Sequence, residues 1–66
     1  MTFRPVDGIR LFGTALNEGE KIFVEYPDGT QTLETVHLMH TVPFVWKTFH
    51  GLKVSVPLSG LKARRP

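Results

Sequence analysis

Hydrophobic and polar residues alternate along much of this chain with the period of two that is typical of β-strands. The alternation is regular in residues 21–26 and in residues 52–56, where Lys53 and Ser55 separate three branched apolar residues. No segment carries apolar residues at the spacing of three and four over the length of a stable helix. Glycine and proline interrupt the pattern at short intervals, as turns between strands do. The pattern therefore predicts an all-β domain.

Five strands are expected, separated by residues that favour turns. The strongest turn signal is Pro27-Asp28-Gly29, because proline fixes φ, aspartate binds nearby backbone N–H groups and glycine accepts a left-handed conformation. We expect one domain, residues 1–66, with flexible tails at residues 1–8 and 62–66. The expected strands are residues 9–16 with a bend at Gly13, 21–26, 30–38 with a bulge between Leu33 and Val36, 41–49, and 52–56.

Two segments resemble the SH3-like small β-barrels. Gly19-Glu20-Lys21-Ile22-Phe23-Val24 looks like the entry strand of that architecture, and Val56-Pro57-Leu58-Ser59-Gly60-Leu61-Lys62 looks like its last strand and the turn that follows. The resemblance covers residues 9–63. It implies a single five-stranded antiparallel barrel with a short 3₁₀ turn near the C-terminus and a leucine that fills the barrel. An OB-like barrel and an open antiparallel sheet are the alternative folds.

The segment Val42-Pro43-Phe44-Val45-Trp46 is apolar on both faces of a strand, so the register of the following hairpin decides which rings are buried. A two-residue His50-Gly51 turn would place Phe44 and Trp46 outside and Lys47 towards the core. A three-residue loop would bury the two rings and expose the lysine. We favour the three-residue loop, because burying a lysine head group costs more than exposing a few carbons.

Either register leaves large apolar residues on the outer face of this hairpin. With the three-residue loop these are Val45 and Phe49, and the second strand adds a further ring. A contiguous exposed apolar patch usually marks an interface. We therefore expect a non-catalytic module that assembles with itself or binds another protein. Its interaction surface would be drawn from Phe23, Phe44, Val45, Trp46 and Phe49.

The charged residues are unevenly distributed, although the formal net charge is only +2. Residues 1–34 contain three basic and six acidic side chains, whereas residues 35–66 contain five basic and no acidic ones. This asymmetry favours an anionic partner, or pairing of acidic with basic surfaces between copies. The alternative function is therefore DNA or RNA binding, in which cations contact phosphate and aromatic rings stack on bases. Its candidate residues are Lys47, His50, Lys53, Lys62, Arg64 and Arg65.

No arrangement of residues indicates catalysis or a bound metal. His37 and His40 would point to opposite faces of a regular strand, and the chain has no cysteine for a zinc–thiolate site. Ser55 and Ser59 lack the flanking residues of a nucleophilic serine. We therefore expect no enzyme, no cofactor and no metal site.

Two families of SH3-like proteins provide a comparison. Lys53-Val54-Ser55-Val56-Pro57 resembles in position the Val-Gln-Ile-Tyr-Pro segment of type II dihydrofolate reductases, but valines replace its functional glutamine and tyrosine. Glu18 and Glu20 with Trp46 resemble the acidic loop and tryptophan by which peptide-binding SH3 domains hold proline-rich ligands, but the usual Ala-Leu-Tyr-Asp-Tyr start is absent. A small oligomeric enzyme is thus the least favoured function.

A chain of 66 residues without cysteine builds only a small core and forms no disulfide, so association with a partner is an available source of stability. No apolar run approaches the roughly 18 residues of a membrane span. The N-terminal residues do not resemble a signal peptide. We expect a cytoplasmic protein that does not bind membranes.

Overall fold

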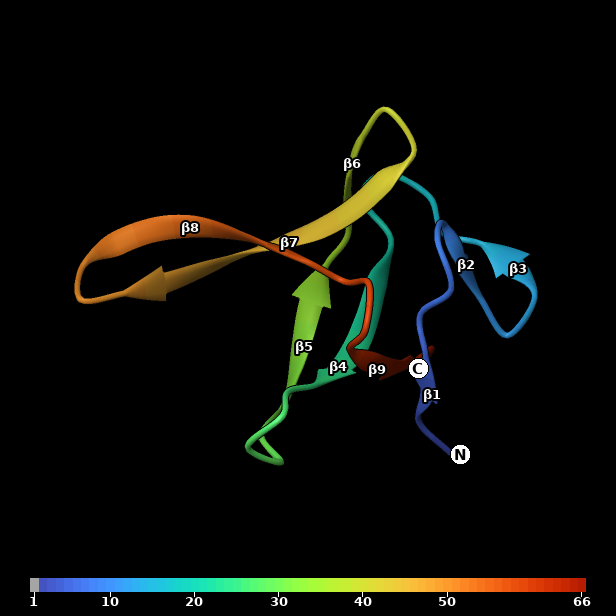
Figure 1. Ribbon diagram of the computed structural model, residues 1–66, viewed down its shortest axis with the longest axis horizontal. Helices are drawn as coiled ribbons and strands as arrows, with labels where there is room; N and C mark the ends of the chain where they lie inside the picture. Colours follow the sequence, from blue (N-terminus) through green and yellow to red (C-terminus); the bar gives the residue numbers. More distant parts are fainter. Residues whose placement is uncertain (1) are drawn as a thin grey trace.

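The protein is built entirely from β-strands. The computed structural model describes residues 2–66, in which nine short strands form three antiparallel sheets and no helix occurs (Figure 1). The described chain therefore contains no helix that could cross a membrane. The all-β prediction is confirmed, but the sheets do not close into one five-stranded barrel. The strands are β1 (Arg4–Pro5), β2 (Arg10–Leu11), β3 (Thr14–Ala15), β4 (Lys21–Glu25), β5 (Gln31–Thr35), β6 (His37–Met39), β7 (Val42–Phe49), β8 (Leu52–Pro57) and β9 (Lys62–Arg64).

Both ends of the described chain belong to a four-stranded sheet with the order β1-β9-β4-β5. β9 lies between β1 and β4, so that Ala63 is opposite Arg4 on one side and opposite Val24 on the other. The segments expected to be tails therefore supply strands of this sheet. Met1, the first residue of the expected N-terminal tail, lies outside the described residues.

β4 and β5 form the hairpin that the alternation and the turn signal predict. The N–H of Gly29 donates to the C=O of Tyr26 at 2.9 Å, and Gly29 has a φ of 89°. The carboxylate of Asp28 accepts the N–H of Thr30 at 2.9 Å. Asp28 and Gly29 thus do what their chemistry suggests.

The strand expected at residues 9–16 is instead a hairpin of β2 and β3. Phe12 and Gly13, with φ values of 55° and 76°, form a two-residue turn between Leu11 and Thr14. Positive φ at both central residues defines the type I′ turn of tight hairpins. A phenylalanine rarely adopts this conformation, so the pattern indicated a bend at Gly13 but not a reversal of the chain.

The expected third strand is interrupted at Val36, within the region where a bulge was expected. The N–H of Val36 donates to the C=O of Glu20 at 2.7 Å, and its C=O accepts the N–H of Gly19 at 2.8 Å. Val36 therefore pairs with the turn that precedes β4. The chain then leaves the four-stranded sheet, and β6 pairs with β7 in the sheet β6-β7-β8.

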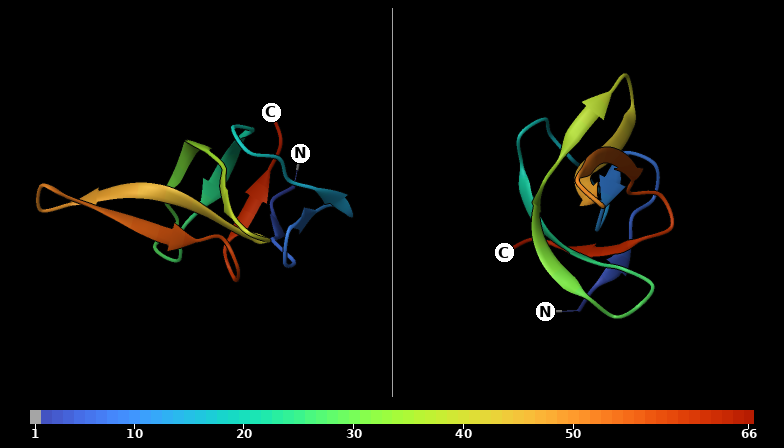
Figure 2. Two further views of the ribbon diagram at one scale, coloured as in Figure 1. Left: turned by 90° about the horizontal axis from the view of Figure 1, so that it is seen from above. Right: turned by 90° about the vertical axis from the view of Figure 1, so that its left-hand side faces the viewer.

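The core draws on all three sheets, with buried side chains from β2, β4, β7 and β9 and from the segments between strands. Figure 2 shows the backbone of these elements from two further directions. Leu58 is fully buried in the segment that joins β8 to β9. The 3₁₀ turn expected there is a β-turn, in which the N–H of Leu61 donates to the C=O of Leu58 at 2.9 Å and Gly60 has a φ of 86°. The buried hydrophobic side chains are Val6, Leu11, Leu16, Ile22, Val24, Val36, Val45, Leu58 and Ala63.

Candidate functional site

Hairpin β7–β8 has a two-residue turn, so the three-residue loop favoured from the sequence is wrong. Phe49 pairs with Leu52 directly across the turn. The turn residues His50 and Gly51 have φ values of 50° and 78°, the type I′ geometry whose twist matches that of the paired strands. Trp46 consequently points away from the core.

Lys47 lies on the inner face of this hairpin, the position that we expected to be too costly for a lysine. Its Nζ is 3.3 Å from Oε2 of Glu34 and 4.7 Å from the centre of the Tyr26 ring. Glu34 is on β5, and its side chain is only 14% exposed. The carboxylate and the aromatic face thus compensate the ammonium group for lost water. Neither partner is near Lys47 in sequence.

Glu34 accepts hydrogen bonds from its own hairpin, β4–β5, and from β7. Its Oε2 accepts the hydroxyl of Tyr26 at 3.0 Å and that of Thr32 at 2.5 Å, in addition to Lys47. Desolvation alone would raise the pKa of Glu34, but the hydrogen bonds from these three residues outweigh it and hold the pKa below its ordinary value. Burial, together with the facing carboxylate, raises the pKa of Tyr26 to about 12. At neutral pH this charged network fastens the base of the hairpin to β5.

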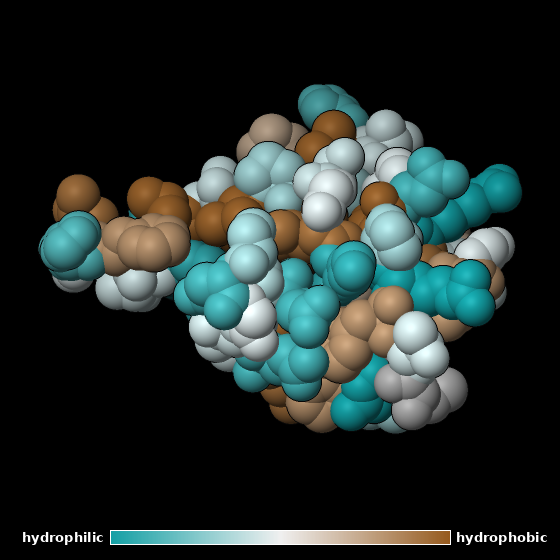
Figure 3. All heavy atoms as spheres, turned by 60° about the horizontal axis from the view of Figure 1, so that its bottom comes forward, coloured by the Kyte–Doolittle hydropathy of each residue, from teal (hydrophilic) through white to brown (hydrophobic). Residues whose placement is uncertain are grey.

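From the level of this network outward, the hairpin continues away from the rest of the molecule as a two-stranded arm, residues 46–55 (Figures 1 and 2). Its apolar side chains are uncovered: Trp46 is 43% exposed, Phe49 54%, Leu52 69% and Val54 38%. In Figure 3 hydrophobic side chains continue along the projecting arm to its tip. An apolar surface of this kind marks a binding site more often than a free surface.

The inner face of the arm carries Phe49, Leu52 and Val54. Between this face and the turn after β4 lies an open hollow of about 540 Å³. Its lining combines apolar, aromatic and charged groups, so it could receive part of a protein surface. The lining residues are Tyr26, Pro27, Asp28, Thr30, Lys47, Thr48, Phe49 and Val56.

The outer face of the arm carries Trp46 and Lys53. The Trp46 ring meets the Phe44 ring edge-on at 5.4 Å, and Nζ of Lys53 lies 5.7 Å from the centre of the Trp46 ring. A smaller hollow of about 270 Å³ lies on this side. Its lining is mostly apolar and consists of Met39, His40, Val42, Phe44, Trp46, Ser55 and Pro57.

The structure brings together only part of the expected interaction surface. Trp46 and Phe49 are exposed on the arm and Phe44 is half-buried, whereas Val45 is fully buried in the core. Phe23 lies on the outer face of β4, away from the arm, with the Arg64 guanidinium 4.5 Å above its ring.

Leu52 and Val54 are functional candidates that the sequence interpretation missed. Their regular alternation with polar residues is the usual signal of a strand that faces a core. The signal is correct for the face on which they lie. It does not reveal that this part of the strand extends past the edge of the core.

The basic residues of the nucleic-acid hypothesis do not share one surface. Lys47 and Arg65 form ion pairs with Glu34 and Glu20, at 3.3 Å and 2.6 Å. Lys53 and His50 belong to the arm, whereas Lys62 and Arg64 belong to β9.

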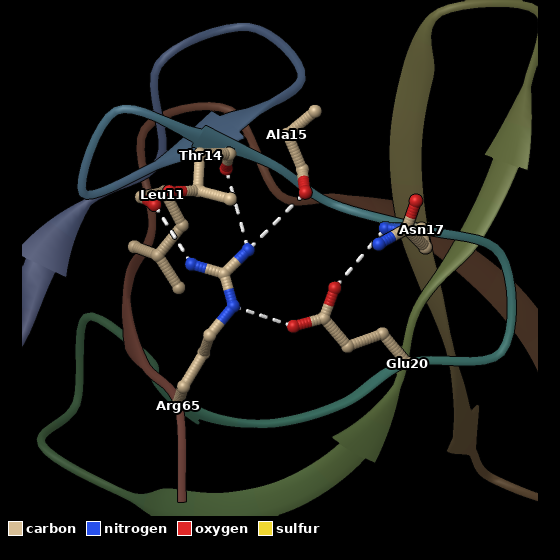
Figure 4. A network of polar contacts seen from close by, with 6 residues as sticks. All are labelled: Leu11, Thr14, Ala15, Asn17, Glu20 and Arg65. Carbon is tan, nitrogen blue, oxygen red and sulfur yellow. Dashed lines mark hydrogen bonds and ion pairs between the residues drawn. The ribbon is translucent and has the colours of Figure 1, made fainter.

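Arg65 fastens the end of the chain to hairpin β2–β3 (Figure 4). Its Nε donates to Oε2 of Glu20 at 2.6 Å, and one terminal nitrogen donates to the C=O of Leu11 at 2.8 Å. The other terminal nitrogen lies 3.3 Å from the carbonyl oxygens of both Thr14 and Ala15. These contacts give Arg65 a structural role instead of leaving its charge free for a ligand.

The three histidines do not converge on one another. Nδ1 of His37 lies 2.8 Å from Oε2 of Glu18, whose other oxygen accepts the N–H of Leu38 at 2.8 Å. The hydrogen bond from Leu38, followed by that from His37, lowers the pKa of Glu18. His40 and His50 occupy two separate turns. Within residues 2–66 no three His, Cys, Asp or Glu side chains are grouped so as to hold a metal ion.

Comparison of the chain with models of protein families, with curated proteins and with solved structures finds no match. The surface of the molecule is therefore the guide to its function. The arm is the feature of that surface that internal packing explains least.

Proposed function

We propose that this protein is a non-catalytic binding and assembly module, and that the arm is the surface through which it associates with protein, in the simplest case a second copy of itself. The observation that carries the proposal is the exposure of Trp46, Phe49, Leu52 and Val54 on one projecting hairpin. Each square ångström of apolar surface that a partner covers stabilises the complex by about 25 cal/mol before the costs of association.

The base of the arm supports the same proposal. The ion pair of Lys47 with Glu34 attaches the base of the arm to β5, and Lys47 also contacts the Tyr26 ring. A hairpin fixed in this way presents its apolar residues in a constant direction, which reduces the entropy lost on binding. A two-sided ribbon suits a protein surface better than a small molecule, since small-molecule sites are concave and enclose most of their ligand.

Sedimentation velocity at increasing protein concentration tests the proposal. We expect the wild-type mass to rise between micromolar and millimolar protein, and Leu52→Lys to weaken association by about tenfold or more because a charge enters the apolar face. Leu33→Lys is the matched control, because Leu33 is 52% exposed on β5, outside the arm. A wild-type chain that stays monomeric throughout, or a control that behaves like Leu52→Lys, contradicts the proposal.

Nucleic-acid binding is the second candidate, favoured by the exposed pair of Trp46 and Lys53 on the outer face of the arm. An aromatic ring beside a cation can stack on a base while the cation contacts phosphate. The same sedimentation experiment with a labelled single-stranded oligonucleotide distinguishes the two functions. Binding that falls steeply with salt favours nucleic acid, whereas association through apolar surface persists in salt.

We keep an SH3-like relationship as a prediction about the fold. Its support is the entry strand, which is β4, and the fully buried Leu58 after β8. A solution structure of the assembled protein tests it, because a partner strand could complete the open sheets.

A further inference from the structure

Within residues 2–66 no strand pairs with the outer edge of β8. β8 is terminal in the sheet order β6-β7-β8. Because the turn has two residues, Phe49 and Leu52 form a hydrogen-bonded pair, and every second residue of β8 from Leu52 onwards directs its backbone groups towards β7. The bond from the N–H of Leu58 to the C=O of Pro43, at 3.0 Å, has the same phase. Lys53, Ser55 and Pro57, which alternate with these residues, direct their backbone groups away from β7.

The outward backbone groups of the arm are those of Lys53 and Ser55. Both residues belong to pairs of the other type, Lys53 with Thr48 and Ser55 with Trp46. Their N–H and C=O groups therefore form a short row along the open edge. Pro57 ends this row of donors because proline has no N–H.

We propose that a second copy of the chain binds this edge, with β8 antiparallel to β8 and Val54 on the twofold axis. This inference rests on the proposed function, because it uses the same arm and names the partner and the register. Adding a strand to an open edge satisfies backbone groups and lets side chains on both faces determine specificity. A twofold arrangement requires a self-complementary strand.

Three registers place the twofold axis at the centre of β8, on Lys53, Val54 or Ser55, and all three satisfy the hydrogen-bonding phase. Charge and proline select the one with Val54 on the axis. With Lys53 on the axis, two lysines would lie directly opposite each other, which is destabilising. With Ser55 on the axis, Lys53 would lie opposite the partner's Pro57, which cannot donate to the lysine's carbonyl group. With Val54 on the axis, Lys53 lies opposite the partner's Ser55, and each of these residues both donates and accepts.

The same register joins the exposed apolar residues of the inner faces. Val54 lies opposite the partner's Val54, and Leu52 lies opposite the partner's Val56 near the base of the other arm. The most exposed apolar residue of the arm, Leu52, at 69%, thereby gains a partly buried neighbour. The outer faces add no like-charge contact, since serine faces lysine there.

The chemistry of the edge strands favours β8 over β5, the terminal strand of the other large sheet. β5 carries Gln31, Thr32, Glu34 and Thr35, so most of its side chains are polar or charged and offer little apolar surface to a partner strand. β8 is rich in valine and leucine, and its only charged residue is Lys53. Lys53 and Pro57 are residue types that natural edge strands use against unspecific pairing, so they restrict the registers in which a partner strand can bind.

Proline substitution at the two edges of the arm tests which edge is used. Ser55→Pro removes an outward N–H from β8 and leaves the bonds to β7 intact, and we expect it to weaken self-association by about thirtyfold, since a twofold dimer loses two hydrogen bonds. Thr48→Pro is the matched control, because the N–H of Thr48 points to the opposite edge of the same arm. Circular dichroism verifies that both variants fold. Equal dimerisation of Ser55→Pro and wild type would overturn the proposal.

Single cysteines test the register, since the chain has no cysteine of its own. In the proposed register the two copies of Val54 face each other across the twofold axis as a non-hydrogen-bonded pair. The Cα atoms of such a pair are about 4.5 Å apart, within the range that a disulfide spans. We expect Val54→Cys to form a covalent dimer under mild oxidation, and Lys53→Cys and Ser55→Cys to do so at least tenfold more slowly. Faster cross-linking at residue 53 or 55 would overturn the register.

The outcomes separate this inference from the proposed function. If the wild type dimerises and Leu52→Lys does not, but Ser55→Pro dimerises normally and Val54→Cys does not cross-link, the arm is the interface and the β8 edge is not. If the wild type is monomeric at all concentrations, both proposals fail together.

Discussion

Glu34 is the residue on which the attachment of the arm depends. Its carboxylate holds Lys47 from β7, Tyr26 from the end of β4 and Thr32 from its own strand. The sequence interpretation placed Lys47 outside because burying a lysine head group costs more than exposing a few carbons. The partner lies thirteen residues earlier, on a strand that only the folded molecule brings beside β7. A pairing of this kind cannot be read from local alternation.

Acid should weaken the fold through Glu34. Because its folded-state pKa lies below the ordinary value of 4.5, its contribution to stability is fully present above about pH 4.5 and is lost as the pH falls through the lower, folded-state pKa. We expect Glu34→Gln to cost about 1–3 kcal/mol at pH 7, since Lys47 then lacks its counter-charge. Urea unfolding of both proteins from pH 7 down to pH 3 checks this. If the difference between them stays constant over that range, Glu34 is not the titrating group.

Hairpins β4–β5 and β7–β8 show how far element-level prediction reaches. The bounds of β4, β7 and β8 follow closely from alternation and from glycine turns, whereas β5 ends at Thr35 and not at the expected Leu38. The register of β7–β8 does not follow from the pattern, because it depends on whether His50 accepts a positive φ. Phe12 poses the same difficulty, and there a whole hairpin was missed. Non-glycine residues with positive φ leave little trace in a sequence.

Substitution at His50 should change the stability of the β7–β8 turn. Asn-Gly is the preferred pair for a type I′ turn, so we expect His50→Asn to raise Tm by a few degrees. His50→Val should cost about 1–2 kcal/mol, because a β-branched residue is strained at a φ of 50°. Thermal unfolding measures both, and amide exchange at Leu52 reports the turn itself. Equal Tm values for the two variants would contradict the type I′ register.

At the scale of the whole molecule, the described ends of the chain hold together the body, which is the part of the molecule outside the arm. β1 and β9 pair with each other, β9 pairs with β4, and Arg65 reaches hairpin β2–β3. The sequence interpretation assigned residues 1–8 and 62–66 to flexible tails. These segments are held in place because β9 pairs with a strand on each side, and that pairing exists only in the folded sheet.

Replacing the guanidinium group of Arg65 should destabilise the body without affecting the arm. Arg65→Met leaves Glu20 and the carbonyl oxygen of Leu11 without their donor, which we expect to cost about 1–3 kcal/mol and to lower Tm by roughly 4–8 °C for each kcal/mol. Arg65→Lys should restore little of the lost stability, since one ammonium group cannot bind both Glu20 and the carbonyl oxygen of Leu11 as the planar guanidinium does. Calorimetry measures the change in Tm. Full rescue by lysine would show that charge alone, and not the shape of the donor set, holds the end in place.

The central place of β9 in its sheet divides the folding of this chain into a fast and a slow part. Hairpin β7–β8 closes between near neighbours in sequence and can form in about 1–10 μs. The sheet β1-β9-β4-β5 must wait for Arg4 to find Ala63, almost the full length of the chain away, and non-local pairings of this kind set the slow rate of β-proteins. The apolar arm would then exist before the body that supports it. This protein is therefore most prone to aggregate during refolding, after the arm has formed and before the four-stranded sheet is complete.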